Sequence, residues 1–303
     1  MVAHALQPGY LLHHQAEPAS TGSPVRSDVS SPAVLRTGIE EAMNATPVIV
    51  VSGATGGMGS AVVEELARSD ATVVLLGRDA GRLERTRQEI DARTGGAGRL
   101  VTYETDINSA ASVDATVAAL VAGLGRVDGL VHTAGDGPLA PLAEADDAMW
   151  QATFNGKLMG AVRLTRALAG PLAEDGGGSV VLVSGVFRKD PDPLFPVNSA
   201  VNAALAAFAK AVSKDLGRAG VRVNVLDPGA VRTPLWDEIA QAIGDRTGAT
   251  AEQVTAQVAA QTPLGRLADP ADVARLAAFL LSPAARHLAG AALTLDGGAS
   301  AGL

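Results

Sequence analysis

Short runs of apolar, largely β-branched residues alternate with helical segments from residue 47 to the end of the chain. Most runs are apolar without interruption, which is typical of parallel strands covered by helices on both faces. This strand–helix rhythm predicts an α/β fold, with one doubly wound parallel sheet of about seven strands in a single domain over residues 47–303. The expected strands are 47–52, 72–77, 99–103, 127–132, 179–184, 221–226 and 291–296.

Two stretches depart from this rhythm. Residues 1–46 are rich in Ser, Pro, Gly and His without a helical or strand period, which predicts a disordered extension. Met43 is a candidate for the true first residue, because Glu-Glu-Ala-Met can be encoded by a bacterial ribosome-binding sequence followed by a start codon. Residues 233–263 contain two helical pieces, and we expect them to form a helical lid over a ligand crevice.

Composition and charge exclude several function classes. Aromatic residues make up 3% of the chain and acidic residues outnumber basic ones by 32 to 24, so we expect no nucleic-acid partner. The absence of cysteine excludes disulfides and thiolate zinc sites, and it fits a cytoplasmic location. No apolar run reaches the roughly 20 residues of a membrane span, so no membrane partner is expected, and neither is a metal site.

A glycine-rich loop follows the first expected strand and precedes the first helix. Gly53, Gly57 and Gly59 have G-x-x-x-G-x-G spacing, with Thr55 and Met58 between them. Small residues at such a turn let the backbone approach a pyrophosphate, whose charge is then met by free amides at the helix N-terminus. The position between a strand and a helix therefore predicts a dinucleotide site of the Rossmann type.

The end of the second strand indicates which dinucleotide binds. Sites for NAD usually place an acid here to hold the ribose 2′-hydroxyl, whereas an arginine accommodates the 2′-phosphate of NADP. Arg78 comes first in this chain, and Asp79 follows where it would cap the next helix. We therefore expect NADPH rather than NADH; the alternative interpretation of Arg78 is a solvated turn charge.

From residue 47 to 303 the chain resembles the short-chain dehydrogenase/reductase family. Besides the glycine loop, the resemblance is carried by "ETDI" (104–107), "HTAG" (132–135), "RVNVLDPGAVRTP" after the sixth strand and the "LGRLADPADVARLAAFLLS" ending. It implies that the cofactor contacts Asp106, Ile107, Ala134 and Gly135 and, on its nicotinamide half, Pro228, Gly229, Val231 and Thr233.

The catalytic positions depart from this family. Its members use a tyrosine as proton donor, a lysine that lowers the tyrosine pKa and holds the nicotinamide ribose, a serine that orients the substrate, and a supporting asparagine. By spacing within the resemblance, Asn198 stands at the tyrosine position and Asn202 at the lysine position. The serine position falls on Gly185, or on Ser184 if the register shifts by one. An amide does not titrate near neutral pH, so neither asparagine can act as a general acid.

Lys157 aligns with the supporting asparagine, whereas Asn155 would align only after a two-residue insertion. We expect Lys157 to reach the same pocket and to hydrogen-bond the ribose or the substrate oxygen, with a pKa lowered by burial and by the nicotinamide. The alternative is a lysine extended along a helix or oligomer interface. We also expect Asn198 to donate a hydrogen bond to the substrate carbonyl; the alternative is that both asparagines satisfy the helix start.

The loop after the fifth strand and the expected lid supply candidate substrate contacts. Arg188 suits an anionic or polar substrate, and aromatic side chains suit an apolar one. The alternatives are a charged surface loop and core packing. The expected contacts are Gly185, Phe187, Arg188 and Trp236.

Together these features favour an atypical NADPH-dependent reductase of a carbonyl, imine or activated C=C in a small-molecule substrate. Hydride transfer itself requires only that the nicotinamide is placed beside an acceptor. Two alternatives stay open: a catalytically silent NADP(H)-binding sensor or scaffold, and a redox-neutral enzyme on the same fold. The family resemblance also implies a homodimer or homotetramer.

Overall fold

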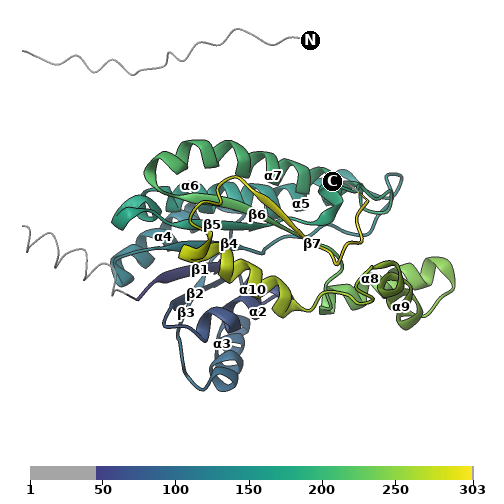
Figure 1. Cartoon of the computed structure of the whole chain (residues 1–303), viewed down its shortest axis with the longest axis horizontal. Helices are drawn as coiled ribbons and strands as arrows, with labels where there is room; N and C mark the ends of the chain where they lie inside the picture. Colours follow the sequence, from purple (N-terminus) through teal and green to yellow (C-terminus); the bar gives the residue numbers. More distant parts are fainter. Residues whose placement is uncertain (1–45, 302–303) are drawn as a thin grey trace, which may run out of the picture. The chain divides into compact units, whose positions relative to one another are not determined.

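The computed structural model describes residues 46–301. Apart from Thr46, the predicted N-terminal extension, with its candidate start at Met43, lies outside the described residues. The described chain forms a single α/β domain in which one parallel sheet lies between two layers of helices (Figure 1). This confirms the predicted fold class.

Seven strands of the described chain pair in the order β3-β2-β1-β4-β5-β6-β7, and every pairing is parallel. The order reverses between β1 and β4, which opens a crevice at the carboxyl ends of these strands. Each expected strand is present, with ends that differ by at most two residues. The strands are β1 Val48–Ser52, β2 Thr72–Gly77, β3 Arg99–Glu104, β4 Gly129–His132, β5 Ser179–Val183, β6 Arg222–Pro228 and β7 Ala292–Leu295.

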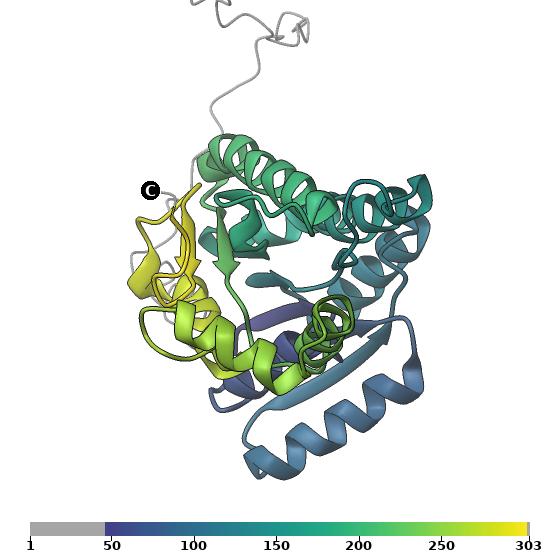
Figure 2. The same cartoon turned by 90° about the vertical axis from the view of Figure 1, so that its right-hand side faces the viewer.

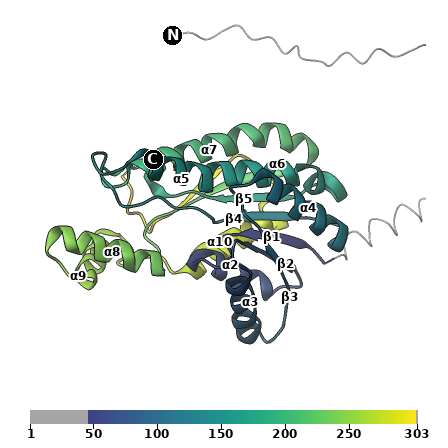
Figure 3. The ribbon, with the colours of Figure 1, turned by 180° about the vertical axis from the view of Figure 1, so that it is seen from behind.

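The two helical layers account for the uninterrupted apolar runs. Val50 of β1 packs into the core under α4, α6 and α7, whereas its neighbour Val51 packs into the core under α2, α3 and α10. Figures 1 and 3 show these layers on opposite faces of the sheet. The layers comprise α2 Gly57–Ala67, α3 Ala80–Thr94 and α10 Pro270–Leu281 on one face, and α4 Ala110–Leu124, α6 Gly160–Ala173 and α7 Pro196–Leu216 on the other.

A π-helical segment, Phe154–Met159, joins α5 (Asp147–Thr153) to α6. π-helical turns of this kind are rare and often occur at functional sites. This segment carries Lys157, and Gly135 of the loop after β4 packs against the Lys157 backbone. The strand–helix rhythm of the sequence does not predict this widened turn.

Two helices, α8 (Pro234–Thr247) and α9 (Ala251–Gln261), occupy the segment that interrupts the strand–helix rhythm. They have a small core of their own, which contains Trp236, Ala240 and Val254. Both lie beyond the carboxyl ends of the strands, at the right of Figure 1. Within residues 46–301, no helix is long and apolar enough to cross a membrane.

Candidate active site

A cavity of about 610 Å³ lies at the carboxyl ends of the strands. Its lining comes from the loops after β1, β4, β5, β6 and β7, from the π-helical segment, and from α7, α8 and α9. Figure 2 views the molecule from this end and shows α8 and α9 in front of the sheet. The carboxyl ends of parallel strands are the usual place for a ligand in such a fold.

The glycine loop forms one end of the cavity and depends on missing Cβ atoms. Gly53 has a φ of +73°, which favours glycine. A Cβ on Gly59 would lie 2.1 Å from the Gly53 carbonyl oxygen, so any larger residue would displace the loop. Gly57 and Met58 also line the cavity, and Thr55 lies half-buried within the loop.

The N-terminus of α2 is open to an anion. No side chain caps it, and no acidic residue stands in its first turn. Its free N–H groups and the positive end of the helix dipole therefore face the glycine loop without a competing carboxylate. This arrangement fits the pyrophosphate of a dinucleotide.

The expected adenine end lies on the same sheet edge, beyond the cavity lining. Arg78 follows β2 directly, is exposed, and has no side-chain hydrogen bond or ion pair to any described residue. Asp79 caps α3 as predicted, accepting from the Arg82 N–H at 2.7 Å. Its carboxylate is thus engaged in the cap, which leaves Arg78 as the charged group nearest the strand end. Asp106 accepts from the Asn108 N–H, at 3.0 Å.

Two of the remaining cofactor candidates lie close to Lys157 on adjoining segments. Ile107 packs against Gly160, the first residue of α6. Gly135 lines the cavity, whereas its neighbour Ala134 does not. A Cβ on Gly53 would meet the Ala134 N–H nitrogen at 2.8 Å, so the glycine loop and the loop after β4 are in close contact.

The loop after β6 forms the opposite wall of the same crevice, and all four of its candidates line the cavity. Thr233 caps α8 by accepting from the Trp236 N–H at 3.3 Å. A Cβ on Gly57 would lie 2.8 Å from Thr233 Cγ2, so this loop and the glycine loop face each other closely. The four are Pro228, Gly229, Val231 and Thr233.

Lys157 lines the cavity and is 5% exposed. Its Nζ donates to the Ser184 carbonyl oxygen at 3.2 Å. Burial lowers the pKa of the Lys157 ammonium, and the carboxylates of Asp136 and Asp227 partly oppose this shift. An ammonium has three donors, so two remain after the bond to Ser184.

Asn198 and Asn202 both line the cavity, 5% and 2% exposed. Asn198 Nδ2 donates to the Gly137 carbonyl oxygen at 3.2 Å, while its Oδ1 has no partner among the described residues. The Asn202 amide has no hydrogen bond to any described residue, and its Oδ1 is buried. Neither side chain caps α7, whose N-cap is Phe195 without a side-chain bond. The alternative that these asparagines satisfy the helix start is therefore wrong.

The loop after β5 holds its residues in different environments. The Ser184 hydroxyl donates to the Asn202 carbonyl oxygen at 3.1 Å, so it is engaged with α7, while Gly185 lines the cavity. Phe187 also lines the cavity and stacks on Phe195, with ring centroids 4.6 Å apart. Arg188 lies outside the lining.

Arg188 pairs with Asp227, a fully buried residue of β6. Its Nε donates to Asp227 Oδ2 at 2.8 Å. The second carboxylate oxygen, Oδ1, has no partner among the described residues. The sequence pattern gave no indication of this pair, because the two residues are distant in the chain and belong to different segments.

His132 supports Lys157 from the end of β4. Its Nε2 lies 3.0 Å from the Lys157 carbonyl oxygen, and its Nδ1 lies 2.7 Å from the Ser52 hydroxyl. Because a carbonyl can only accept, Nε2 carries the hydrogen and Nδ1 accepts from Ser52. Burial lowers the pKa of His132 to about 4. A polar residue at the end of each of two paired strands, Ser52 and His132, is the signal that could have indicated this contact.

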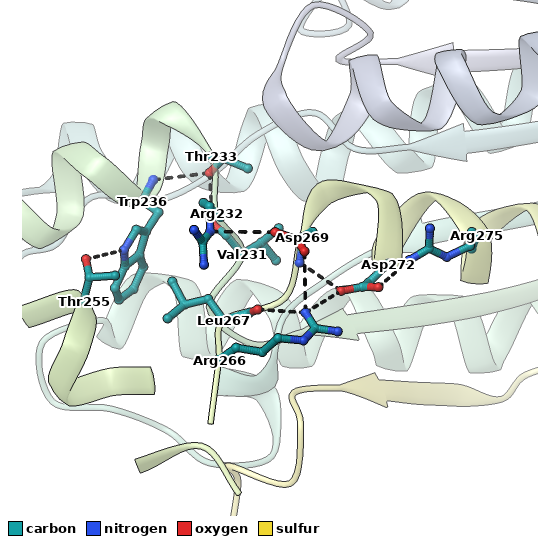
Figure 4. A network of polar contacts seen from close by, with 10 residues as sticks. All are labelled: Val231, Arg232, Thr233, Trp236, Thr255, Arg266, Leu267, Asp269, Asp272 and Arg275. Carbon is teal, nitrogen blue, oxygen red and sulfur yellow. Dashed lines mark hydrogen bonds and ion pairs between the residues drawn. The ribbon is translucent and has the colours of Figure 1, made fainter. Parts of the chain in front are cut away.

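The α8–α9 pair is held together and anchored at its base (Figure 4). Trp236 lines the cavity, and its Nε1 donates to Thr255 Oγ1 of α9 at 2.9 Å. At the base, Arg266 donates to Asp272 of α10 at 2.9 Å. The cavity wall formed by these helices is therefore tied to the core by polar contacts.

Comparison with known proteins gives consistent matches. The family model described as "Enoyl-(Acyl carrier protein) reductase" matches residues 53–300. The chain is 33% identical over 255 residues to cis-4-hydroxycyclohexanecarboxylate dehydrogenase from Sinomonas cyclohexanicum, which covers 84% of this chain and 96% of that relative.

Two solved structures have the same fold at 30% identity. L-sorbose reductase from Gluconobacter frateurii, solved with NADPH and L-sorbose, superposes with a TM-score of 0.79 over 86% of this chain and 98% of its own. A short-chain type dehydrogenase/reductase from Mycobacterium ulcerans superposes with a TM-score of 0.75 over 84% of this chain and 89% of its own.

Proposed function

Because this chain belongs to the short-chain dehydrogenase/reductase family and is an oxidoreductase, we propose that it is an atypical NADPH-dependent reductase. Its substrate is a small molecule with a carbonyl, imine or activated C=C. The reaction proceeds without the usual tyrosine and lysine pair. The observation that carries this proposal is Lys157, a buried ammonium with two unused donors, beside the two asparagines in the cavity.

The residues at the dinucleotide site fit NADPH. The glycine loop and the uncapped N-terminus of α2 suit the pyrophosphate, and Arg78 is available for the 2′-phosphate. The loop from Pro228 to Thr233 would contact the nicotinamide half. When bound, NADPH supplies a hydride to the substrate.

The polar groups of the cavity stabilise charge rather than transfer a proton through a tyrosine. An acceptor oxygen gains negative charge as it is reduced, and preorganised donors in a dry site lower that cost. Lys157 is placed to donate to this oxygen or to the nicotinamide ribose. Its lowered pKa also favours proton release, as a general acid requires. Asn198 has one N–H left after its bond to Gly137 and is a second donor.

The test combines binding and turnover. NADPH and NADH are titrated by calorimetry, and oxidation at 340 nm is then followed with ketones, imines and quinones. We expect tighter binding of NADPH and a measurable rate with at least one acceptor. Lys157→Met should lower kcat by a factor of about 10²–10⁴, with NADPH still bound.

Lys214→Met, at an exposed position on α7, is the matched control and should leave the rate unchanged. Full turnover in Lys157→Met would refute the role of this lysine. Tight NADPH binding without turnover of any acceptor would refute the reductase and favour the silent binder or the redox-neutral enzyme. The two non-titrating asparagines are the observation that keeps those alternatives open.

Two further expectations accompany this function. The α8–α9 pair acts as a lid over the substrate half of the cavity, because Trp236 contributes to the cavity wall. The protein pairs through α6 and α7, as the family resemblance implies. Sedimentation velocity would test this second point, and a monomer would contradict it.

A further inference from the structure

The substrate half of the cavity combines an apolar wall with acidic side chains. Phe187, Leu194 and the lid residues Trp236, Ile239 and Ile243 form the apolar wall. We infer that the acceptor is a cationic C=N group, an iminium ion carried on an apolar body. This inference rests on the proposed reductase function and names its substrate class.

Four aspartates line the cavity, against two basic residues. Of the basic pair, Arg266 is already engaged by Asp272, which leaves Lys157 alone to offset the carboxylates. None of the four is paired with a lysine or arginine within residues 46–301. The cavity therefore carries net negative charge, which favours a cation over an anion. The four are Asp136, Asp190, Asp192 and Asp296.

Backbone hydrogen bonds fix two of these carboxylates and leave one oxygen of each unused. Asp136 accepts from the Gly137 N–H at 2.9 Å, and Asp192 accepts from the Leu194 N–H at 2.7 Å. In each case only Oδ1 is engaged, so Oδ2 has no hydrogen-bond partner among the described residues. Each of the two carboxylates is therefore held in place with one oxygen left to face a ligand, as a preorganised cation site requires.

The buried asparagines are an independent sign of a ligand. Asn202 is 2% exposed and lines the cavity, yet its amide has no hydrogen bond to any described residue. Buried polar groups in proteins are almost always paired, so an unpaired amide at a cavity wall indicates a polar ligand group. The Asn202 Oδ1 carries a partial negative charge that suits a positively charged C=N group.

Iminium reduction also explains the missing tyrosine. One C–H bond forms at the iminium carbon with hydride from NADPH, and the C=N π pair becomes the nitrogen lone pair. NADPH is oxidised to NADP⁺, the substrate is reduced to a neutral amine, and no proton is consumed. A ketone instead ends as an alkoxide that needs a proton. A site without a tyrosine acid therefore suits the iminium, which needs no proton, better than the ketone.

Lys157 is compatible with a cationic substrate. Burial lowers its pKa, so it loses its proton more readily than an exposed lysine and repels a nearby cation less. In either protonation state its Nζ can donate hydrogen bonds to the ribose hydroxyls.

A matched pair of acceptors tests the inference. The 2-methyl-3,4-dihydroisoquinolinium cation and 1-tetralone have similar bicyclic shapes, but only the first is charged. With NADPH, and after subtraction of the enzyme-free rate, we expect kcat/KM for the cation to exceed that for the ketone by at least about tenfold. Asp192→Asn and Asp136→Asn should each lower kcat/KM roughly fivefold for the cation alone. Asp114→Asn, at an exposed position on α4, is the control.

Binding supplies a second readout. With NADP⁺ present, calorimetry should show tighter binding of the 2-methyltetrahydroisoquinolinium ion than of 1-tetralol, and weaker binding of that ion to Asp192→Asn. Turnover of the ketone but not of the cation would overturn the inference and leave the reductase intact. Equal effects of the aspartate variants on both acceptors would also overturn it. If the protein neither binds NADPH nor oxidises it with any acceptor, the proposed function itself is refuted.

Discussion

The two halves of the cavity differ in which part of the chain forms them: backbone groups form one half and side chains the other. The proposed cofactor half is shaped by the backbone: N–H groups at the start of α2, a positive φ at Gly53, and the absence of a Cβ at Gly59. The proposed substrate half is shaped by side chains, among them Lys157 and Asn202. Backbone geometry tolerates little change, whereas side chains can be exchanged on an unchanged fold. New chemistry is therefore expected in the second half and ordinary dinucleotide binding in the first.

The largest effect is expected from Gly59→Ala. The new Cβ would lie 2.1 Å from the Gly53 carbonyl oxygen, so the phosphate-binding loop must move. We expect NADPH binding to weaken at least about a thousandfold, measured by calorimetry. Gly170→Ala in α6, where a Cβ meets nothing within 4 Å, should bind normally. Unchanged affinity in Gly59→Ala would show that this loop does not hold the cofactor.

His132, which contacts Ser52 on one side and the Lys157 backbone on the other, is expected to make the stability of the fold depend on pH. Its pKa is lowered from 6.5 to about 4 in the folded protein, so the unfolded state binds more protons between these values. The free energy of unfolding should therefore fall by about 3 kcal/mol as the pH falls from 6.5 to 4. Urea unfolding of the wild type and of His132→Asn measures this contribution.

The His132→Asn variant should have a flatter pH dependence across this window than the wild type. His287→Asn removes an exposed histidine and should leave the dependence unchanged. The same slope in His132→Asn and the wild type would contradict the assignment.

Cofactor choice is expected to depend on Arg78. Arg78→Ala should weaken NADPH binding about tenfold, or about 1.4 kcal/mol, because a charged contact to the 2′-phosphate is lost. NADH binding should not change, since NADH lacks that phosphate. Arg218→Ala, an exposed arginine beyond α7, controls for net charge. An equal loss for both dinucleotides would assign Arg78 to something other than the phosphate.

The smallest effect is expected from Asn202→Leu, which should change the stability of the fold and the function of the substrate half in opposite directions. Asn202→Leu removes an unpaired buried amide, so it should raise the free energy of unfolding by about 1 kcal/mol while weakening NADPH binding or turnover. Asn224 is a buried asparagine with both ends of its amide engaged, by Leu288 and Ala291. Asn224→Leu should destabilise by about 2 kcal/mol. A destabilised Asn202→Leu would mean that its amide has a structural role.

Local patterns in the sequence predicted much of this molecule. The β-branched runs predicted the seven strands that the described residues form, and the Asp79 cap followed from its place at a helix start. The glycine loop was predicted because its three glycines lie within seven consecutive residues, from Gly53 to Gly59. The pairs His132–Ser52 and Arg188–Asp227 were not predicted, because each joins segments that only the fold brings together. The sequence shows asparagine at positions 198 and 202. Which of their side-chain atoms lack a hydrogen-bond partner depends on packing and could not be predicted.

The π-helical turn at Phe154–Met159 also acts as a phase adjustment between two helices. Each added residue turns the following helix by about 100°, and a widened turn absorbs one residue without moving the rest. Leu164 and Leu168 of α6 can then stay in the core while Lys157 faces the cavity. After a single-residue deletion within the turn, either the leucines of α6 would leave the core or Lys157 would turn away from the cavity. The same deletion in the loop before α5 would be absorbed by that loop, so tolerance to length changes is expected to drop abruptly where α5 begins.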